Sequence, residues 1–222
     1  FCHAYILSGL ADQVLVADGG SDDDTVAIAE GLSGVKVAEY SGQVFGVSGS
    51  NWRNPHGEHI NFLIDWASAE GADWIIFDDC DGVPNRLLQK RGREYLEESN
   101  CGYALAVRIY FWGSDQWFPE LSKDRAGSWM AGLWAWRANK DLRADEANPW
   151  KHGFNRLFPL GVSDKDVLGI LPPAALIHRP WPTEEKAQEK LEFYKGTGQH
   201  PGMQHPKIFG GRSEPIVEWM QG

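Results

Sequence analysis

Cysteine is scarce in this 222-residue sequence. The three cysteines, Cys2, Cys80 and Cys101, are odd in number, and none belongs to a Cys-x-x-Cys pair. Such spacing excludes the disulfide framework of a small secreted domain and a thiolate zinc site. We therefore expect a reduced, intracellular protein located in the cytoplasm.

Basic residues and long apolar runs are also scarce. Lys and Arg number 21 against 31 Asp and Glu, which gives a formal net charge of -10, and the sequence pI is near 5.1. Nucleic acid and anionic membranes attract a basic face, so neither is an expected partner. No apolar run approaches the ~20 residues of a membrane span, and no signal segment opens the chain. We expect a soluble protein.

Several catalytic motifs are absent. His56-Gly57-Glu58-His59 lacks the spacing that places two zinc-binding histidines on one helix face. The glycines at 46 and 49 are not followed by the Lys-Ser or Lys-Thr of a Walker phosphate loop, and no Gly-x-Ser-x-Gly elbow is present. These absences exclude three common classes of hydrolase and direct attention to the acidic segments.

The most distinctive stretch covers residues 74–85. Trp74-Ile75-Ile76-Phe77 reads as a buried strand, and three carboxylates follow it at once, those of Asp78, Asp79 and Asp81. Carboxylates just beyond a strand's carboxyl end lie where open α/β sheets bind ligands, and they repel one another unless a cation or protons neutralise them. Asp79 and Asp81 alternate along an extended chain and offer oxygens to Mg²⁺ or Mn²⁺. The alternative is an acidic turn that caps the next helix.

Apolar segments and helical periods alternate along the chain. Strands are expected at 13–17, 35–39, 74–77 and 103–111, and helices at 4–11, 26–32, 59–70 and 85–98. This alternation of strands and helices predicts an α/β fold with a mixed, mostly parallel, doubly wound sheet flanked by helices. Further strands are expected at 129–137 and 174–178, an irregular segment at 139–173 and a helix from 182. We expect one domain over residues 1–195 and a surface-wrapping tail over 196–222.

Two acidic segments together point to a family. Val14-Leu15-Val16-Ala17 ends in Asp18-Gly19-Gly20-Ser21 and a helix, and the strand at 74–77 ends in Asp79-Cys80-Asp81. A strand with an Asp-Gly-Ser-type turn, followed later by a strand with an Asp-x-Asp motif, resembles the family-two glycosyltransferases of the GT-A fold. The resemblance covers roughly residues 4–110 well and the rest loosely. It implies a GT-A, Rossmann-like fold and a metal-dependent enzyme that moves a sugar from a nucleotide-diphosphate donor to a glycan or other hydroxyl acceptor.

The resemblance also implies roles for individual residues. Asp18 would contact the base or ribose of the nucleotide sugar, and capping its own turn is the alternative. Asp81 would bind Mn²⁺ or Mg²⁺, Asp79 would lie near ribose and metal, and the metal would stabilise charge on the leaving nucleoside diphosphate. His178 would complete the metal site, with a structural histidine as the alternative. Arg179 would offset the diphosphate charge or would simply be solvated.

Acceptor activation requires a carboxylate in an inverting enzyme, and inversion by direct displacement is expected. By position the candidates for this general base are Asp164 and Asp166, then Asp145 and Glu146, and for each of them a plain surface charge is the alternative. Eleven tryptophans are present, with a cluster between residues 112 and 136. The resemblance makes Trp117, Trp134 and Trp136 candidates for a wall that stacks on the acceptor, and core packing is the alternative.

The family's first strand normally precedes its first helix. We expect that strand upstream of Phe1, because a parallel sheet without its central strand leaves backbone groups unpaired. Two other functions stay open. A nucleotidyltransferase with a similar sheet would attack phosphorus instead of an anomeric carbon. A non-catalytic carbohydrate-binding or structural module would account for the many tryptophans and for the absence of a clear base.

Overall fold

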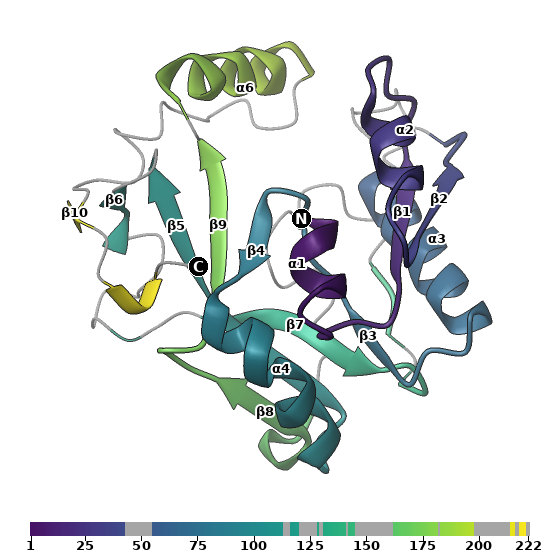
Figure 1. The fold of residues 1–222 in the computed structure, drawn as a ribbon, viewed down its shortest axis with the longest axis vertical. Helices are drawn as coiled ribbons and strands as arrows, with labels where there is room; N and C mark the ends of the chain where they lie inside the picture. Colours follow the sequence, from purple (N-terminus) through teal and green to yellow (C-terminus); the bar gives the residue numbers. More distant parts are fainter. Residues whose placement is uncertain are drawn as a thin grey trace.

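The structure is a computed structural model that describes residues 1–42, 55–112, 116–119, 128, 131–140, 142–144, 162–181, 183–197, 214–215 and 218–220. It confirms the predicted α/β class, with a mixed sheet flanked by helices (Figure 1). Each predicted strand is present within a few residues of its expected bounds. The apolar runs of the sequence therefore identify these strands correctly.

The N-terminal part of the chain forms a small parallel unit. It consists of α1 (Cys2–Ile6), β1 (Val14–Asp18), α2 (Thr25–Glu30) and β2 (Val35–Glu39). α1 is followed by Gly9, whose φ of 74° suits glycine at a helix exit. β1 and β2 pair in parallel from Val14 opposite Val35 to Asp18 opposite Glu39, and α2 makes the crossover that parallel strands need.

A larger sheet, with its helices, forms around one long central strand, β5 (Tyr103–Trp112). The described elements from residue 55 onward are α3 (Pro55–Ala69), β3 (Trp74–Ile76), β4 (Gly82–Pro84), α4 (Arg86–Glu98), β5, β6 (Gln116–Trp117), β7 (Ala131–Arg137), β8 (Val167–Ile170), β9 (Leu176–Trp181), α6 (Glu184–Thr197) and β10 (Glu214–Pro215), with short 3-10 turns at 164–166 and 218–220. β5 pairs antiparallel with β6 and β7 and parallel with β8 and β9. β4 joins the sheet through an antiparallel pairing with β9.

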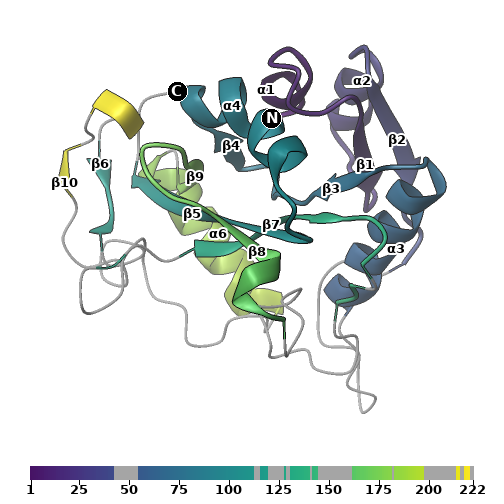
Figure 2. The same cartoon turned by 90° about the horizontal axis from the view of Figure 1, so that it is seen from below.

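Helices cover both faces of the sheet around β5. Alternate residues of a strand point to opposite faces, and in β5 the side chains on both faces are buried. Ala104 and Ala106 pack in one cluster with Leu88 of α4, and Tyr103 packs in another with Ile60 of α3. Figure 2 shows α1 and α4 on one side of the sheet and α3 on the other. β5 is thus the buried centre of a three-layered core.

A cavity separates the two sheets. Within the described ranges, β1 pairs only with β2 and β3 pairs only with β7. The cavity between β1 and β3 has a volume of about 560 Å³, and its lining includes Val14 and Leu15 on one side and Trp74 and Ile75 on the other. A further strand in this space could pair with both open edges. The strand expected upstream of Phe1 stays a prediction.

Three sequence expectations need correction. The segment 139–173 is not wholly irregular, because β8 lies within it and pairs with β5 from Tyr103 to Ala106. The turn before α4 contains a short strand, β4, which the sequence analysis missed. Trp117, Trp134 and Trp136 do not form an acceptor wall, since each is at most 5% exposed and packs in the core.

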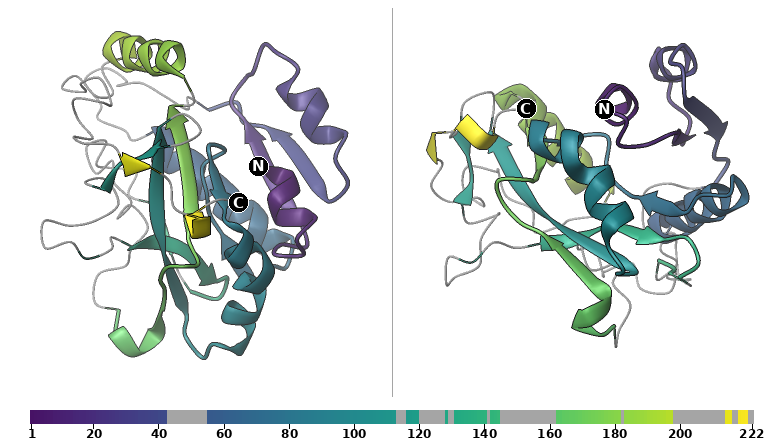
Figure 3. Two further views of the ribbon diagram at one scale, coloured as in Figure 1. Left: turned by 60° about the vertical axis from the view of Figure 1, so that its left-hand side comes forward. Right: turned by 60° about the horizontal axis from the view of Figure 1, so that its bottom comes forward.

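The described parts of the 196–222 tail contact the sheet. β10 pairs with β6, and Met220 is buried beside Val107 and Ile109 of β5. The left view of Figure 3 shows α6 near one end of β9 and β8 near the opposite end of the molecule. Among the described helices, none is both long enough and apolar enough to cross a lipid bilayer.

Candidate functional site

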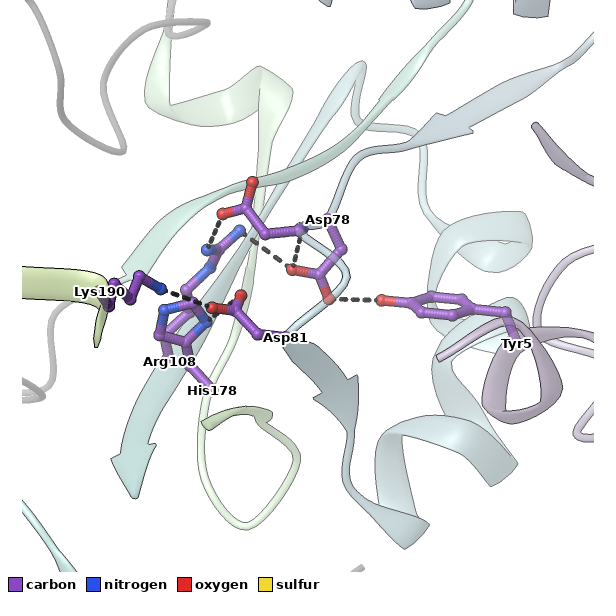
Figure 4. A network of polar contacts seen from close by, with 7 residues as sticks. Tyr5, Asp78, Asp81, Arg108, His178 and Lys190 are labelled. Carbon is purple, nitrogen blue, oxygen red and sulfur yellow. Dashed lines mark hydrogen bonds and ion pairs between the residues drawn. The ribbon is translucent and has the colours of Figure 1, made fainter. Parts of the chain in front are cut away.

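The acidic segment predicted from the sequence forms the loop between β3 and β4. β3 is held by β7, and the backbone N–H of Phe77 donates to the carbonyl oxygen of Trp134 at 2.9 Å. On the far side of the loop, β4 pairs with β9 so that Gly82 lies opposite His178. The N–H of Arg179 also donates to the carbonyl oxygen of Asp81 at 2.8 Å. The loop is therefore fixed at both ends by the sheet, and Figure 4 shows the side chains of Asp78 and Asp81 that it carries.

Asp78 is the buried carboxylate of this loop, with its side chain 1% exposed. The Tyr5 hydroxyl donates to its Oδ2 at 2.7 Å, and Arg108 Nη2 lies 3.2 Å from its Oδ1. Burial raises the pKa of Asp78 to about 6, against the opposing effects of Arg108 and the Tyr5 hydrogen bond. A Cβ at Gly82 would lie 2.5 Å from Oδ1, so only glycine leaves room for this carboxylate. Asp78 therefore ties the loop to α1 and β5.

Arg108 is the buried cation between two of the carboxylates. Its Nη1 lies 3.3 Å from Asp79 Oδ2, while Nη2 contacts Asp78. Burial opposes its charge, but Asp78 and Asp79 raise the pKa of Arg108 overall. Sequence reasoning missed this residue. The available signal was a lone charge between Val107 and Ile109 in an apolar strand, since a charge buried there needs a partner.

Asp81 lies between two nitrogen groups from the C-terminal part of the chain. His178 Nδ1 is 3.2 Å from Asp81 Oδ1, and Lys190 Nζ of α6 is 3.2 Å from Oδ2. Burial lowers the pKa of His178, against the opposing effect of Asp81, and so favours the neutral imidazole. Its ring meets the Tyr110 ring edge-on, with centroids 4.9 Å apart. Asp81 is partnered by two groups that lie about a hundred residues away in the sequence.

The side chains around Asp81 match a divalent-cation site in part. Within the described residues there is no group of three or more His, Cys, Asp and Glu side chains arranged to hold a metal. Asp81 and His178 do converge, and His178 Nδ1 is buried without hydrogen-bond geometry to any described partner. Asp79 instead points to Arg108. One or two protein ligands are enough for an ion that takes its other ligands from water and substrate phosphates. The Asp81 carboxylate suits Mg²⁺ or Mn²⁺, and the His178 imidazole suits a transition metal such as Mn²⁺ better than Mg²⁺, so these two side chains could hold such an ion.

A model of the family described as glycosyl transferase family 2 matches residues 4–161, which is more than half of the chain. The chain belongs to this family. No curated protein matches it. The family supports a glycosyl transfer activity for this chain. Asp79, Asp81 and Arg108 lie inside the matched residues, whereas His178 and Lys190 lie beyond them.

In this glycosyl transferase family 2 domain, Asp18 lies at the end of β1 and interacts with its own turn. Its Oδ2 accepts hydrogen bonds from the N–H groups of Gly20 and Ser21, each at 2.9 Å, and the Ser21 hydroxyl donates to Oδ1. The side-chain bond from Ser21, followed by the backbone bonds, lowers the pKa of Asp18. The capping role considered from the sequence is therefore present. None of these described hydrogen bonds links Asp18 to Asp81 or His178.

The candidate bases Asp164 and Asp166 lie away from this network. Asp166 forms an ion pair with Lys140 at 2.7 Å and accepts a hydrogen bond from the Gly102 N–H. It comes just before Val167, which pairs with Tyr103 at the start of β5, whereas His178 pairs with Tyr110. Seven residues of strand separate these two points, or about 23 Å at ~3.3 Å per residue. The structure does not bring Asp164 or Asp166 to Asp81.

The remaining predicted residues have other placements. Arg179 is exposed, and its guanidinium lies over the Phe111 ring at 5.1 Å. Neighbouring residues of a strand point to opposite faces, so Arg179 is directed away from His178. Asp145 and Glu146 lie outside the described residues. The network that the structure assembles thus comprises Asp78, Asp79, Asp81, Arg108, His178 and Lys190.

Proposed function

We propose that this protein transfers a sugar from a nucleotide-diphosphate donor to an acceptor hydroxyl, with Asp81 and His178 holding Mn²⁺ or Mg²⁺. The observation that supports this most strongly is the pairing of β4 with β9, which brings the Asp81 carboxylate within 3.2 Å of a buried imidazole nitrogen. Two electron-pair donors so close together suit a shared cation. The bound ion would stabilise negative charge on the leaving nucleoside diphosphate.

Arg108 has a positioning role in this proposal. Because the guanidinium holds Asp78 and Asp79 at once, it fixes the Asp79 carboxylate at the mouth of the loop. Asp79 is 41% exposed at its side chain, so it can still accept hydrogen bonds from a ligand such as the donor's ribose. Asp18 is proposed to contact the nucleotide from the β1 side, through the part of its turn that solvent reaches.

The reaction is proposed to proceed with inversion by direct displacement, as the family resemblance implies. We assign the general base to no residue. Asp164 and Asp166 are separated from Asp81 by the length of β5, and the ion pair with Lys140 already neutralises Asp166. Arg179 is likewise assigned no diphosphate contact, because its side chain packs over Phe111.

Ligand-dependent thermal stability tests the proposal. UDP, GDP, ADP and CDP are each added with and without Mn²⁺ to the wild type, to Asp81→Asn and to His178→Ala. A ligand at 100 times its Kd stabilises by about 2.7 kcal/mol, or roughly 5–10 °C for a domain of this size. One nucleotide should do so only with Mn²⁺, and both variants should lose the shift.

Asp65→Asn is the matched control, because Asp65 is an exposed carboxylate paired with Arg143 outside the network. It should keep the full shift. A wild type that no nucleotide stabilises with Mn²⁺, or an Asp81→Asn variant that keeps the shift, would contradict the proposal. With donor sugar present, release of nucleoside diphosphate supports glycosyl transfer, and release of pyrophosphate supports a nucleotidyltransferase. Glycan binding without any turnover, unchanged in Asp81→Ala, supports a binding module.

A further inference from the structure

Helix α6, which lies beyond the residues matched by the family, contributes the Lys190 ammonium to the network. Ala187 is 1% exposed and packs on Phe118 and Tyr110, and Leu191 is 7% exposed. Residues three and four apart share one helix face, so Lys190 lies on the same face as Ala187. Its ammonium reaches Asp81 Oδ2 at 3.2 Å across 109 residues of sequence (Figure 4). The packing of α6 therefore sets where this charge lies.

The contact between Lys190 and Asp81 is accessible to ligands. The two side chains are 32% and 29% exposed, so water and small ligands can reach them. A lysine ammonium is a compact charge on a flexible four-carbon stem, with three donors that can change partner. The ammonium can therefore leave Asp81 by rotation of its own side chain, while Ala187 and Leu191 keep α6 in place.

Lys190 is paired with Asp81, the same carboxylate that the proposed function assigns to the metal. A divalent cation on Asp81 would lie beside the ammonium, and the two positive charges would repel each other. A diphosphate arriving with the metal reverses this effect, because its oxygens attract the same ammonium. The charge of Lys190 thus disfavours the metal alone and favours the metal together with the diphosphate.

We propose that Lys190 is an exchangeable counter-ion, which neutralises Asp81 in the ligand-free protein and moves to the donor diphosphate when metal and nucleotide bind together. This rests on the proposed function, because it needs Asp81 to be a metal ligand. The consequence is positive coupling between the two ligands: each binds more tightly when the other is present, by the same factor. In this proposal Lys190 is a ligand-binding residue, because its ammonium contacts the donor diphosphate directly.

Binding measurements on Lys190→Gln test the proposal. Mn²⁺ alone is titrated by following the electron paramagnetic resonance signal of the free ion. The best of the four nucleoside diphosphates is then titrated by calorimetry at saturating Mn²⁺. Removing the competing charge should tighten Mn²⁺ alone three- to tenfold and weaken the nucleotide about tenfold. Lys190→Arg keeps the charge and should resemble the wild type for Mn²⁺ alone.

Lys186→Gln is the matched control on the same helix. Lys186 is 61% exposed and pairs with Glu189, so its loss should change neither titration. If Lys190→Gln binds Mn²⁺ no more tightly than the wild type while Asp81→Asn abolishes binding, the counter-ion proposal is wrong and the proposed function stands. If Asp81→Asn leaves Mn²⁺ and nucleotide binding intact, the proposed function fails, and this inference fails with it.

Discussion

The turn after β1 and the loop after β3 both present carboxylates, but the partners of those carboxylates come from different distances along the chain. Asp18 is held by Gly20 and Ser21, two and three residues away. Asp78 is held by Tyr5 and Asp81 by Lys190, which are 73 and 109 residues away. The first turn can form from its own sequence, whereas the second requires the folded sheet. The partners that hold the carboxylates of the β3 loop are therefore brought into place only by the tertiary structure.

The same contrast holds for the strands that carry these turns. β1 has one described neighbour, β2, and a cavity lies on its other side. β5, which supplies Arg108, has four strand neighbours and is buried on both faces. A site that draws on β4, β5 and β9 is preorganised by the buried sheet around β5. The Asp18 turn belongs to a less supported part.

The largest expected effect is on the long-range network. Arg108→Met leaves the Asp78 carboxylate buried without its cation, and breaking a buried ion pair by removing one partner costs about 3–5 kcal/mol. Urea unfolding should show this loss of stability. Arg91→Met is the control, since its ion pair with Glu94 is on the surface and should contribute less than about 1 kcal/mol.

A double variant separates the network from simple loss of packing. Adding Asp78→Asn to Arg108→Met removes the uncompensated charge, so at least about half of the lost stability should return. If the double variant is no more stable than Arg108→Met alone, the cost lies in packing around residue 108. The β3 loop would then depend less on its long-range ion pairs, and would differ less from the Asp18 turn, than the structure indicates.

Hydrogen exchange measures the next contrast, between β1 and the centre of the sheet. With one neighbouring strand among the described residues and a cavity on its other side, β1 should open locally far more often than β5. We expect its backbone amides to exchange at least about 100-fold faster, which corresponds to about 2.7 kcal/mol at about 1.36 kcal/mol per tenfold. In a longer form of the protein whose upstream residues add a strand between β1 and β3, the amides of β1 should become protected. Equal protection of β1 and β5 in the present chain would contradict the expectation.

The elements with strong local signals were predictable. The period of α4 and its start are visible in the sequence, and Asn85 caps the helix by accepting the Leu88 N–H at 3.0 Å. The Asp18 turn was predictable for the same reason, since all its bonds lie within four residues. Family resemblance supplied Asp79, Asp81 and His178 as the metal site. The register of β4 on β9 brings Asp81 and His178 together, whereas Asp79 pairs with Arg108.

The features that were missed depend on distant partners. β8 has four residues and becomes a strand because β5 lies beside it, and strand propensity depends strongly on such context. Arg108 was visible as a charge in an apolar strand, but its bond to Asp78 and Asp79 requires the loop and β5 to be placed together. Asp166 was expected near the site because of its position in the sequence, and its pairing with Lys140 places it elsewhere.

The smallest effect is expected at the local turn. Asp18→Ala removes the acceptor of three hydrogen bonds, at a cost of about 1 kcal/mol because the freed donors are near solvent. The pKa of Asp18 is lowered in the folded protein, chiefly by Ser21. The ionised carboxylate thus contributes its full stabilisation above the ordinary Asp pKa of about 3.9 and loses it as the pH falls through the lower folded value. Urea unfolding of wild type and Asp18→Ala should therefore show a larger difference in stability at pH 7 than at pH 3.

The control is Asp18→Asn, which keeps an acceptor oxygen without the charge and should have a stability between the two at pH 7. A difference between wild type and Asp18→Ala that does not change with pH would assign the effect to turn geometry alone.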